Sequence, residues 1–215
     1  MRNAPLQFFA TLLICSMTLF SGPACAEPPV EFSWAVLTGT DEGLRPLDFT
    51  TPPKLKNGAT IQIYLEQKPG VYLYLYLIDS SGEVAFLYPG EKDFYSKVAP
   101  SDRVFRLPTD TNRFELTPPS GQEKLYLLAG ANRLDKLEKI TAAFLDQPGH
   151  PLRKEEVVKE LKRLRQEHST LVQVTETSVP VAGTVRSRGV PSDSFEATKV
   201  NAVGFYSRIL RIDHD

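Results

Sequence analysis

The side chains best suited to acid–base or metal chemistry are the three histidines, His150, His168 and His214. Paired metal ligands on a helix usually stand three or four residues apart, and no two of these histidines do. A serine nucleophile on a Gly-x-Ser-x-Gly turn is also absent from the sequence. We therefore expect each histidine to be solvated or to lie near a helix end, and keep a hydrolase that uses His168 or His214 as an alternative.

Three tyrosines, Tyr72, Tyr74 and Tyr76, alternate with leucines and therefore point to one face of a single strand. An exposed row of this kind is a candidate surface for a ligand or a partner, since tyrosine offers both a flat apolar ring and a hydroxyl. The other interpretation is that helices cover the row. We favour the covered row, because soluble proteins seldom leave such a patch open.

Other classes of function lack a signal. The sequence contains neither of the glycine-rich strings that cradle phosphate groups, so we expect no nucleotide cofactor. Its 25 Lys and Arg residues are balanced by 26 Asp and Glu residues, a net charge of −1 that disfavours nucleic acid binding. The locally basic run Lys159 to Arg165 is interleaved with glutamates and is typical of a solvated helix face. No metal site is predicted.

The first 26 residues differ from the rest of the chain. Arg2 is followed by an apolar run from Phe8 to Phe20 and then by Ala24-Cys25-Ala26. This order predicts a secretory signal peptide cut after Ala26, and hence a periplasmic or secreted protein. The apolar run is shorter than the roughly 20 residues that cross a bilayer, so we expect no transmembrane span in the mature chain.

Both cysteines, Cys15 and Cys25, fall in this segment. A chain cut after Ala26 would therefore have no disulfide, no thiolate nucleophile and no cysteine metal ligand. A lipid anchor on Cys25 is the alternative. It is disfavoured because Gly22-Pro23-Ala24 lacks the large aliphatic residue usual before such a cysteine.

Apolar alternation and turn residues predict most of the strands. The expected strands are residues 30–37, 59–66, 71–78, 83–88, 103–107, 113–116 and 123–129, then 171–174 and one within 203–212. The turn Asp79-Ser80-Ser81-Gly82 joins two of them in a hairpin. Residues 38–53 and 89–102 are expected to be loops. From alternation alone, the inward-facing set is Ile61, Ile63, Leu65, Leu73, Leu75, Leu77, Leu125 and Leu127.

The period changes to that of a helix after Asn132, which is a good helix N-cap. Pro151 opens a second helix, in which Val157, Leu161, Leu164 and His168 share one stripe. Together the elements predict one α+β domain over residues 27–215. Its expected form is a mostly antiparallel β-sandwich or small barrel, with a two-helix insertion at about 132–168 packed on one side.

Several segments also resemble a known bacterial family. They are Leu55-Lys56-Asn57-Gly58-Ala59, Val71 to Tyr76, Gly82-Glu83-Val84, Leu87-Tyr88-Pro89, Gly121 to Ala129, Arg133-Leu134-x-x-Leu137-Glu138 and the closing Phe205 to His214. In these the chain is similar to the family called domain of unknown function 4384, best over residues 50–135. The resemblance implies an exported or envelope-associated accessory domain with no established catalytic residues. Members are sometimes fused to protease or kinase domains, and no such partner domain is seen in this sequence.

We therefore expect a non-enzymatic, exported binding or protein-interaction module of the bacterial envelope, without a cofactor and with a protein or envelope component as partner. A structural or assembly component of an envelope complex is the main alternative. If the tyrosine row is covered, the loops 38–53 and 89–102 are the expected place for recognition.

Overall fold

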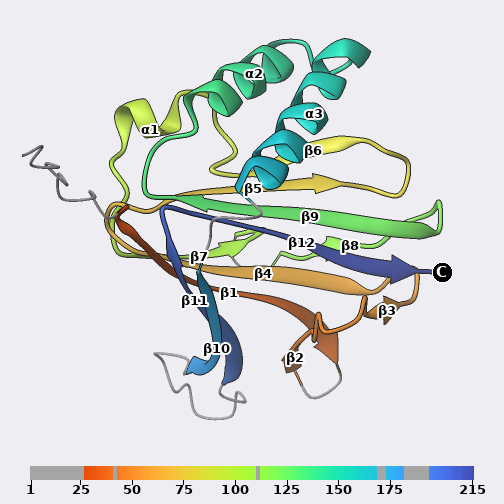
Figure 1. Ribbon diagram of the computed structural model, residues 1–215. Helices are drawn as coiled ribbons and strands as arrows, with labels where there is room; N and C mark the ends of the chain where they lie inside the picture. The colour runs from red at the N-terminus through yellow and green to blue at the C-terminus, as the bar shows by residue number, and fades with distance from the viewer. Residues whose placement is uncertain (1–26, 41–42, 110–111, 169–172, 182–193) are drawn as a thin grey trace, which may run out of the picture.

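Two β-sheets pack face to face, and a pair of helices covers the outer face of one of them (Figure 1). The computed structural model describes residues 27–40, 43–109, 112–168, 173–181 and 194–215. The predicted signal peptide, residues 1–26, and the first two residues of the predicted strand 171–174 lie outside the described residues. The predicted α+β class and the sandwich are confirmed, with two mostly antiparallel sheets and a helix pair.

The first sheet has the strand order β10-β11-β1-β4-β7, with β2 paired to β1 and β8 paired to β4. Its strands are β1 (Pro29–Thr40), β2 (Gly43–Pro46), β4 (Thr60–Gln67), β7 (Arg103–Leu107), β8 (Phe114–Glu115), β10 (Val174–Val181) and β11 (Phe195–Val203). All the pairings within it are antiparallel.

The second sheet has the order β3-β12-β9-β5-β6. Its strands are β3 (Lys54–Leu55), β5 (Tyr72–Ile78), β6 (Val84–Tyr88), β9 (Gly121–Gly130) and β12 (Phe205–His214). Only the short contact between β3 and β12 is parallel. The last strand of the described chain therefore lies inside this sheet rather than at its margin.

The main core fills the space between the sheets. The predicted inward-facing residues lie there: seven of them are buried, and Leu77 is partly buried against the same cluster. Successive side chains of a strand point to opposite faces, so the leucines of β5 face this core and the tyrosines between them face the other side. The sequence pattern and the observed burial therefore agree.

The helices are α1 (Phe94–Lys97), α2 (Asp135–Asp146) and α3 (Pro151–His168). The last two lie over the second sheet (Figure 1). Val157, Leu161 and Leu164 of α3 form a second core with the tyrosines of β5. This insertion buries the outer face of β5 and explains why that strand is apolar or aromatic at nearly every position.

The short helix α1 closes the edge of β5 where β6 stops. β6 pairs with β5 only from Leu75 to Ile78. At Leu73 the hydroxyl of Tyr95 takes over: it accepts from Leu73 N at 2.9 Å and donates to Leu73 O at 2.8 Å. One side chain thus satisfies both backbone groups of a residue that has no neighbouring strand on that side.

Four local expectations need correction. The predicted loop 38–53 contains β2, the predicted loop 89–102 contains α1, and β11 was not predicted. Asn132 is not the N-cap of α2. The helix begins after Leu134, whose N–H donates to the Tyr74 hydroxyl at 3.1 Å, so a tertiary contact replaces the expected side-chain cap.

Candidate functional site

The helices α2 and α3 cover most of the tyrosine row. Tyr74 and Tyr76 are 0% exposed, and their hydroxyls bond to α2 at Glu138 Oε1 (2.6 Å) and Thr141 Oγ1 (2.8 Å). Tyr72 is partly buried, and its ring meets that of Tyr95 edge to face at 5.0 Å. The candidate ligand or partner surface at Tyr72, Tyr74 and Tyr76 is therefore not open in this structure, because α2 and α3 lie over it.

The histidines lie in three separate places. His150 is exposed in the turn before α3, and His168 packs its ring on Phe205 at 4.2 Å. His214 departs from expectation, since its side chain is 0% exposed. Its Nε2 lies 3.0 Å from Glu123 Oε1 and its Nδ1 lies 2.8 Å from Asn57 Oδ1.

Both ring nitrogens of His214 are thus occupied by Glu123 and Asn57. A histidine that activates a hydroxyl nucleophile needs one nitrogen on that hydroxyl. Among the described residues, no serine or threonine hydroxyl bonds to the ring. The arrangement ties β12 to β9 and to the segment before β4.

A pocket lies beside Glu123, between the two sheets and next to the strands β6 and β8. Its volume is about 280 Å³. Side chains from both sheets form its apolar wall: Ile61, Ile63, Leu77, Leu87, Phe114, Leu116, Leu125 and Ile212. Its polar lining is Asp79, Ser80, Ser81, Glu115, Thr117 and Glu123. Apolar walls with a few polar groups are typical of ligand sites, and the volume is at the small end of the range of about 300–1,000 Å³.

The mouth of this pocket is built from the β5–β6 turn and the segment before β9. Gly82 has φ +84°, which lets the turn close, and Asp79 Oδ1 accepts from Glu83 N at 2.7 Å. Ser80 Oγ donates to Pro119 O at 2.6 Å. A Cβ on Gly121 would come within 2.9 Å of Ser80 Cβ, so only glycine allows the two segments to approach this closely.

The carboxylate of Glu123 anchors this mouth from inside. Glu123 is only 7% exposed, and its Oε1 accepts from Ser80 N at 3.1 Å as well as lying against His214. Among the described residues, none donates a hydrogen bond to the other oxygen, Oε2. The side chain lines the pocket, so this oxygen is available to a ligand.

The charged side chains of the described residues that line the pocket are all acidic. Asp79, Glu115 and Glu123 line it, and no Lys or Arg is among its described lining residues. A ligand there would therefore meet an apolar wall and carboxylate oxygens.

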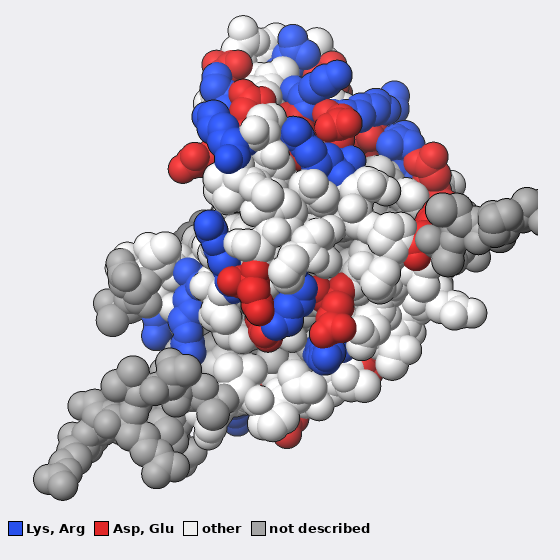
Figure 2. All heavy atoms as spheres, turned by 90° about the vertical axis from the view of Figure 1, so that its left-hand side faces the viewer, with Lys and Arg blue, Asp and Glu red and all other residues white. Residues whose placement is uncertain are grey.

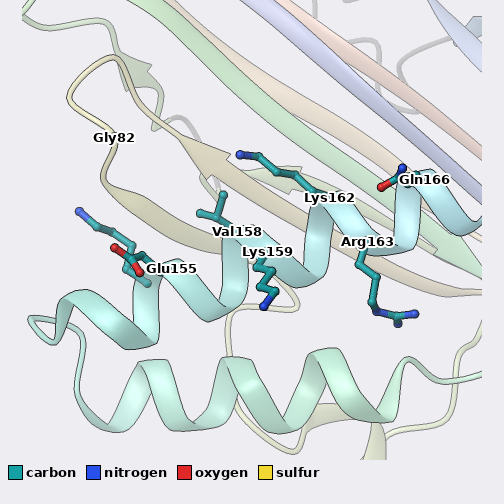
Figure 3. Close-up of a pocket in the computed structure, with 8 residues that line it drawn as sticks. Gly82, Glu155, Val158, Lys159, Lys162, Arg163 and Gln166 are labelled. Carbon is teal, nitrogen blue, oxygen red and sulfur yellow. The ribbon is translucent and has the colours of Figure 1, made fainter.

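A larger but more open groove runs along α3, with a volume of about 620 Å³. Figure 3 shows Lys162 and Arg163 pointing away from each other along this helix. Lys154 pairs with Glu83 at 2.7 Å, and Arg163 pairs with Glu160 at 2.7 Å. Figure 2 shows Lys and Arg interleaved with Asp and Glu over the helix pair at the top of the view. This surface matches the predicted solvated, ion-paired helix face, and it offers no enclosed site.

A third hollow of about 250 Å³ lies on the opposite side of the sandwich, beside Trp34 and Arg208. The Arg208 guanidinium lies 5.3 Å from the centre of the Trp34 ring and pairs with Glu176. Trp34 itself is 3% exposed, so its ring is covered and cannot stack on a ligand. Residues 47–50 of the predicted recognition loop 38–53 line this hollow, whereas neither predicted loop contributes to the pocket at Glu123.

The family comparison points to the same part of the chain. Residues 54–133 match the sequence family called domain of unknown function DUF4384. This segment is a DUF4384 domain. It contains every residue that lines the pocket at Glu123 except Ile212. No curated protein and no solved structure matches the chain.

The DUF4384 segment supplies β3 to β9, and strands outside it complete both sheets. Among the described residues there is no helix long and apolar enough to cross a membrane. The described part of the chain also has no cluster of three or more His, Cys, Asp or Glu side chains that could hold a metal ion.

Proposed function

We propose that the protein is a non-enzymatic, exported binding module that holds an apolar group of its ligand in the pocket between the sheets. The single observation that supports this proposal best is the pocket itself, with apolar walls from both sheets and polar groups gathered at its mouth. Such a division lets the walls supply binding energy and the polar groups supply orientation.

Binding without catalysis fits the side chains around the pocket. The nearest buried acid–base pair is Glu123 and His214, and His214 also bonds Asn57 through its second ring nitrogen. Both groups are therefore engaged in holding strands together. The hydroxyls of Ser80 and Ser81 are likewise engaged, with Pro119 O and Asp79 Oδ1.

Export is the second part of the proposal, and it rests on the apolar run before Ala24-Cys25-Ala26. N-terminal sequencing of protein recovered from its native host should begin at Glu27. A mature chain that begins at an acylated Cys25 would replace secretion with a lipid anchor. Retention of Met1 would contradict export with cleavage.

Binding in the pocket can be tested with small alkyl compounds and methyl NMR. Titration with 1-hexanol should shift the methyl signals of Ile61, Ile63 and Leu77, which line the pocket. Thr117→Trp places a large ring at the exposed mouth and should abolish these shifts. Thr175→Trp is the matched control, because Thr175 is exposed on β10 and lies away from the pocket. Shifts of equal size in both variants, or none in the unmodified protein, would refute a binding role for the pocket.

A further inference from the structure

We infer that the ligand of the inter-sheet pocket is an alkyl amine group, an apolar chain that carries a positive charge. The inference rests on the proposed binding function and names the chemistry that the same site selects. It starts from the three carboxylates and the absence of any Lys or Arg among the described residues of the lining.

The deepest of these carboxylates is short of donors. Glu123 is 7% exposed, and the two hydrogen-bonding groups of the described residues that contact it, Ser80 N at 3.1 Å and His214 Nε2 at 3.0 Å, both lie against Oε1. Oε2 is not among the fully buried unpaired atoms, so it reaches the open space of the pocket, and a carboxylate that is mostly withdrawn from water gains from a donor there. An ammonium group has three N–H donors and would supply the missing one at Oε2.

The other two carboxylates, Asp79 and Glu115, also favour a positively charged ligand. Glu115 is exposed at the mouth, and Asp79 Oδ1 accepts from Ser81 Oγ and Glu83 N, each at 2.7 Å. A fatty acid or a phosphate group would face repulsion from this rim, whereas a cation would be attracted to it. The negative rim thus distinguishes between ligands with the same apolar chain.

The apolar walls determine the size and polarity of the part of the ligand that lies inside the pocket. A volume of about 280 Å³ between Ile63, Leu77 and Leu125 accommodates an unbranched alkyl chain but not a folded domain. An alkyl amine can come from a free small molecule or from a lysine side chain of another protein. Both present the same group, so the test contains an arm for each.

The test compares three ligands of one chain length, hexylamine, 1-hexanol and hexanoate, by calorimetry or methyl NMR. Hexylamine should bind about tenfold or more tightly than 1-hexanol, since a charged hydrogen bond is gained, and hexanoate should bind most weakly. An acetylated and amidated Gly-Lys-Gly peptide represents the lysine arm. Binding of hexylamine alone assigns a free amine, and binding of the peptide as well assigns a lysine side chain.

Two variants locate the preference. Glu123→Gln should bring the affinities for hexylamine and 1-hexanol to within about twofold of each other while leaving 1-hexanol binding in place. Glu115→Gln changes an exposed group and should reduce the preference in part, so it serves if the buried variant does not fold. Glu91→Gln, at an exposed position outside the pocket, should leave the preference unchanged.

The outcomes separate the two proposals. Equal affinity for the three ligands, or tighter binding of hexanoate, would overturn the amine inference and leave the binding function standing. No binding of any of them would overturn both. A preference for hexylamine that survives Glu123→Gln and Glu115→Gln alike would also overturn the inference.

Discussion

The hydroxyl of Tyr74 lies 2.6 Å from Glu138 Oε1 and joins the middle of β5 to the first turns of α2. The oxygen of the Tyr74 hydroxyl also accepts from Leu134 N at 3.1 Å, where the helix begins. Arg133 pairs with Glu138 on the other side. This contact fixes the start of the helix pair on the sheet.

Tyr74→Ala should therefore lower the free energy of unfolding by about 3–5 kcal/mol, since it removes a large buried aromatic side chain. Tyr74→Phe keeps the ring and loses only the hydroxyl contacts, which predicts about 1–3 kcal/mol. Urea denaturation measures both. A change of less than about 0.5 kcal/mol for Tyr74→Ala, as expected of a surface residue, would mean that the helices do not cover the row.

Leu75→Ala should destabilise the protein by about 2–5 kcal/mol, because Leu75 is 1% exposed between the sheets. The matched control is Leu152→Ala, the same substitution at a leucine that is 61% exposed, with an expected effect within about 0.5 kcal/mol. Similar losses for the two leucine variants would contradict the packing described for β5.

His214→Ala should lower the unfolding free energy by about 1–3 kcal/mol, because it removes one of the donors to the buried Glu123 carboxylate. His150→Ala provides the comparison at an exposed histidine and should change stability by no more than about 0.5 kcal/mol. Thermal melts of both variants at one pH suffice. Equal melting temperatures would show that the Glu123–His214 contact contributes nothing to the fold.

Alkaline pH should weaken the fold through its buried tyrosines. Burial raises the pKa of Tyr88 from 10.0 to about 12, and burial also raises the pKa of Tyr74, Tyr95 and Tyr206. A pKa raised in the folded state means that the folded protein holds the proton more tightly than the unfolded chain. The stability is therefore complete below pH 10 and is lost as the pH rises from about 10 toward 12.

Urea denaturation at a series of alkaline pH values measures this loss. Tyr88→Phe removes one of the titrating groups and should make the decline shallower than in the unmodified protein. A steeper decline in the variant would contradict the sign of the effect.

The sequence predicted the strands in which apolar side chains alternate with polar or aromatic ones along the chain. Leucines and isoleucines at every second residue of β4, β5 and β9 marked the core because alternation in a strand maps directly onto two faces. β11 was missed for the converse reason. Two of its buried positions, Ala197 and Ala202, carry alanine, whose small side chain gives little contrast with the exposed residues between them.

The candidate site was beyond prediction because it depends on how the sheets meet. Glu123 and His214 are 91 residues apart, and only the pairing of β9 with β12 brings them together. A histidine next to the chain end suggested exposure, but β12 lies between β3 and β9 and buries it. The turn at Asp79 was predicted correctly, and nothing in its sequence indicated that it faces a pocket.

The placement of β12 has a consequence for the order in which the protein can form. β9 lies between β5 and β12, and β1 lies between β4 and β11, so each sheet needs a strand from the last 21 described residues, 195–215, to be complete. A chain emerging from a ribosome or a translocation pore in the N-to-C direction would hold the DUF4384 segment for some time with the β12-facing edge of β9 unpaired. Long-range pairings of this kind slow folding. The two sheets would therefore stay incomplete until residues 195–215 have emerged.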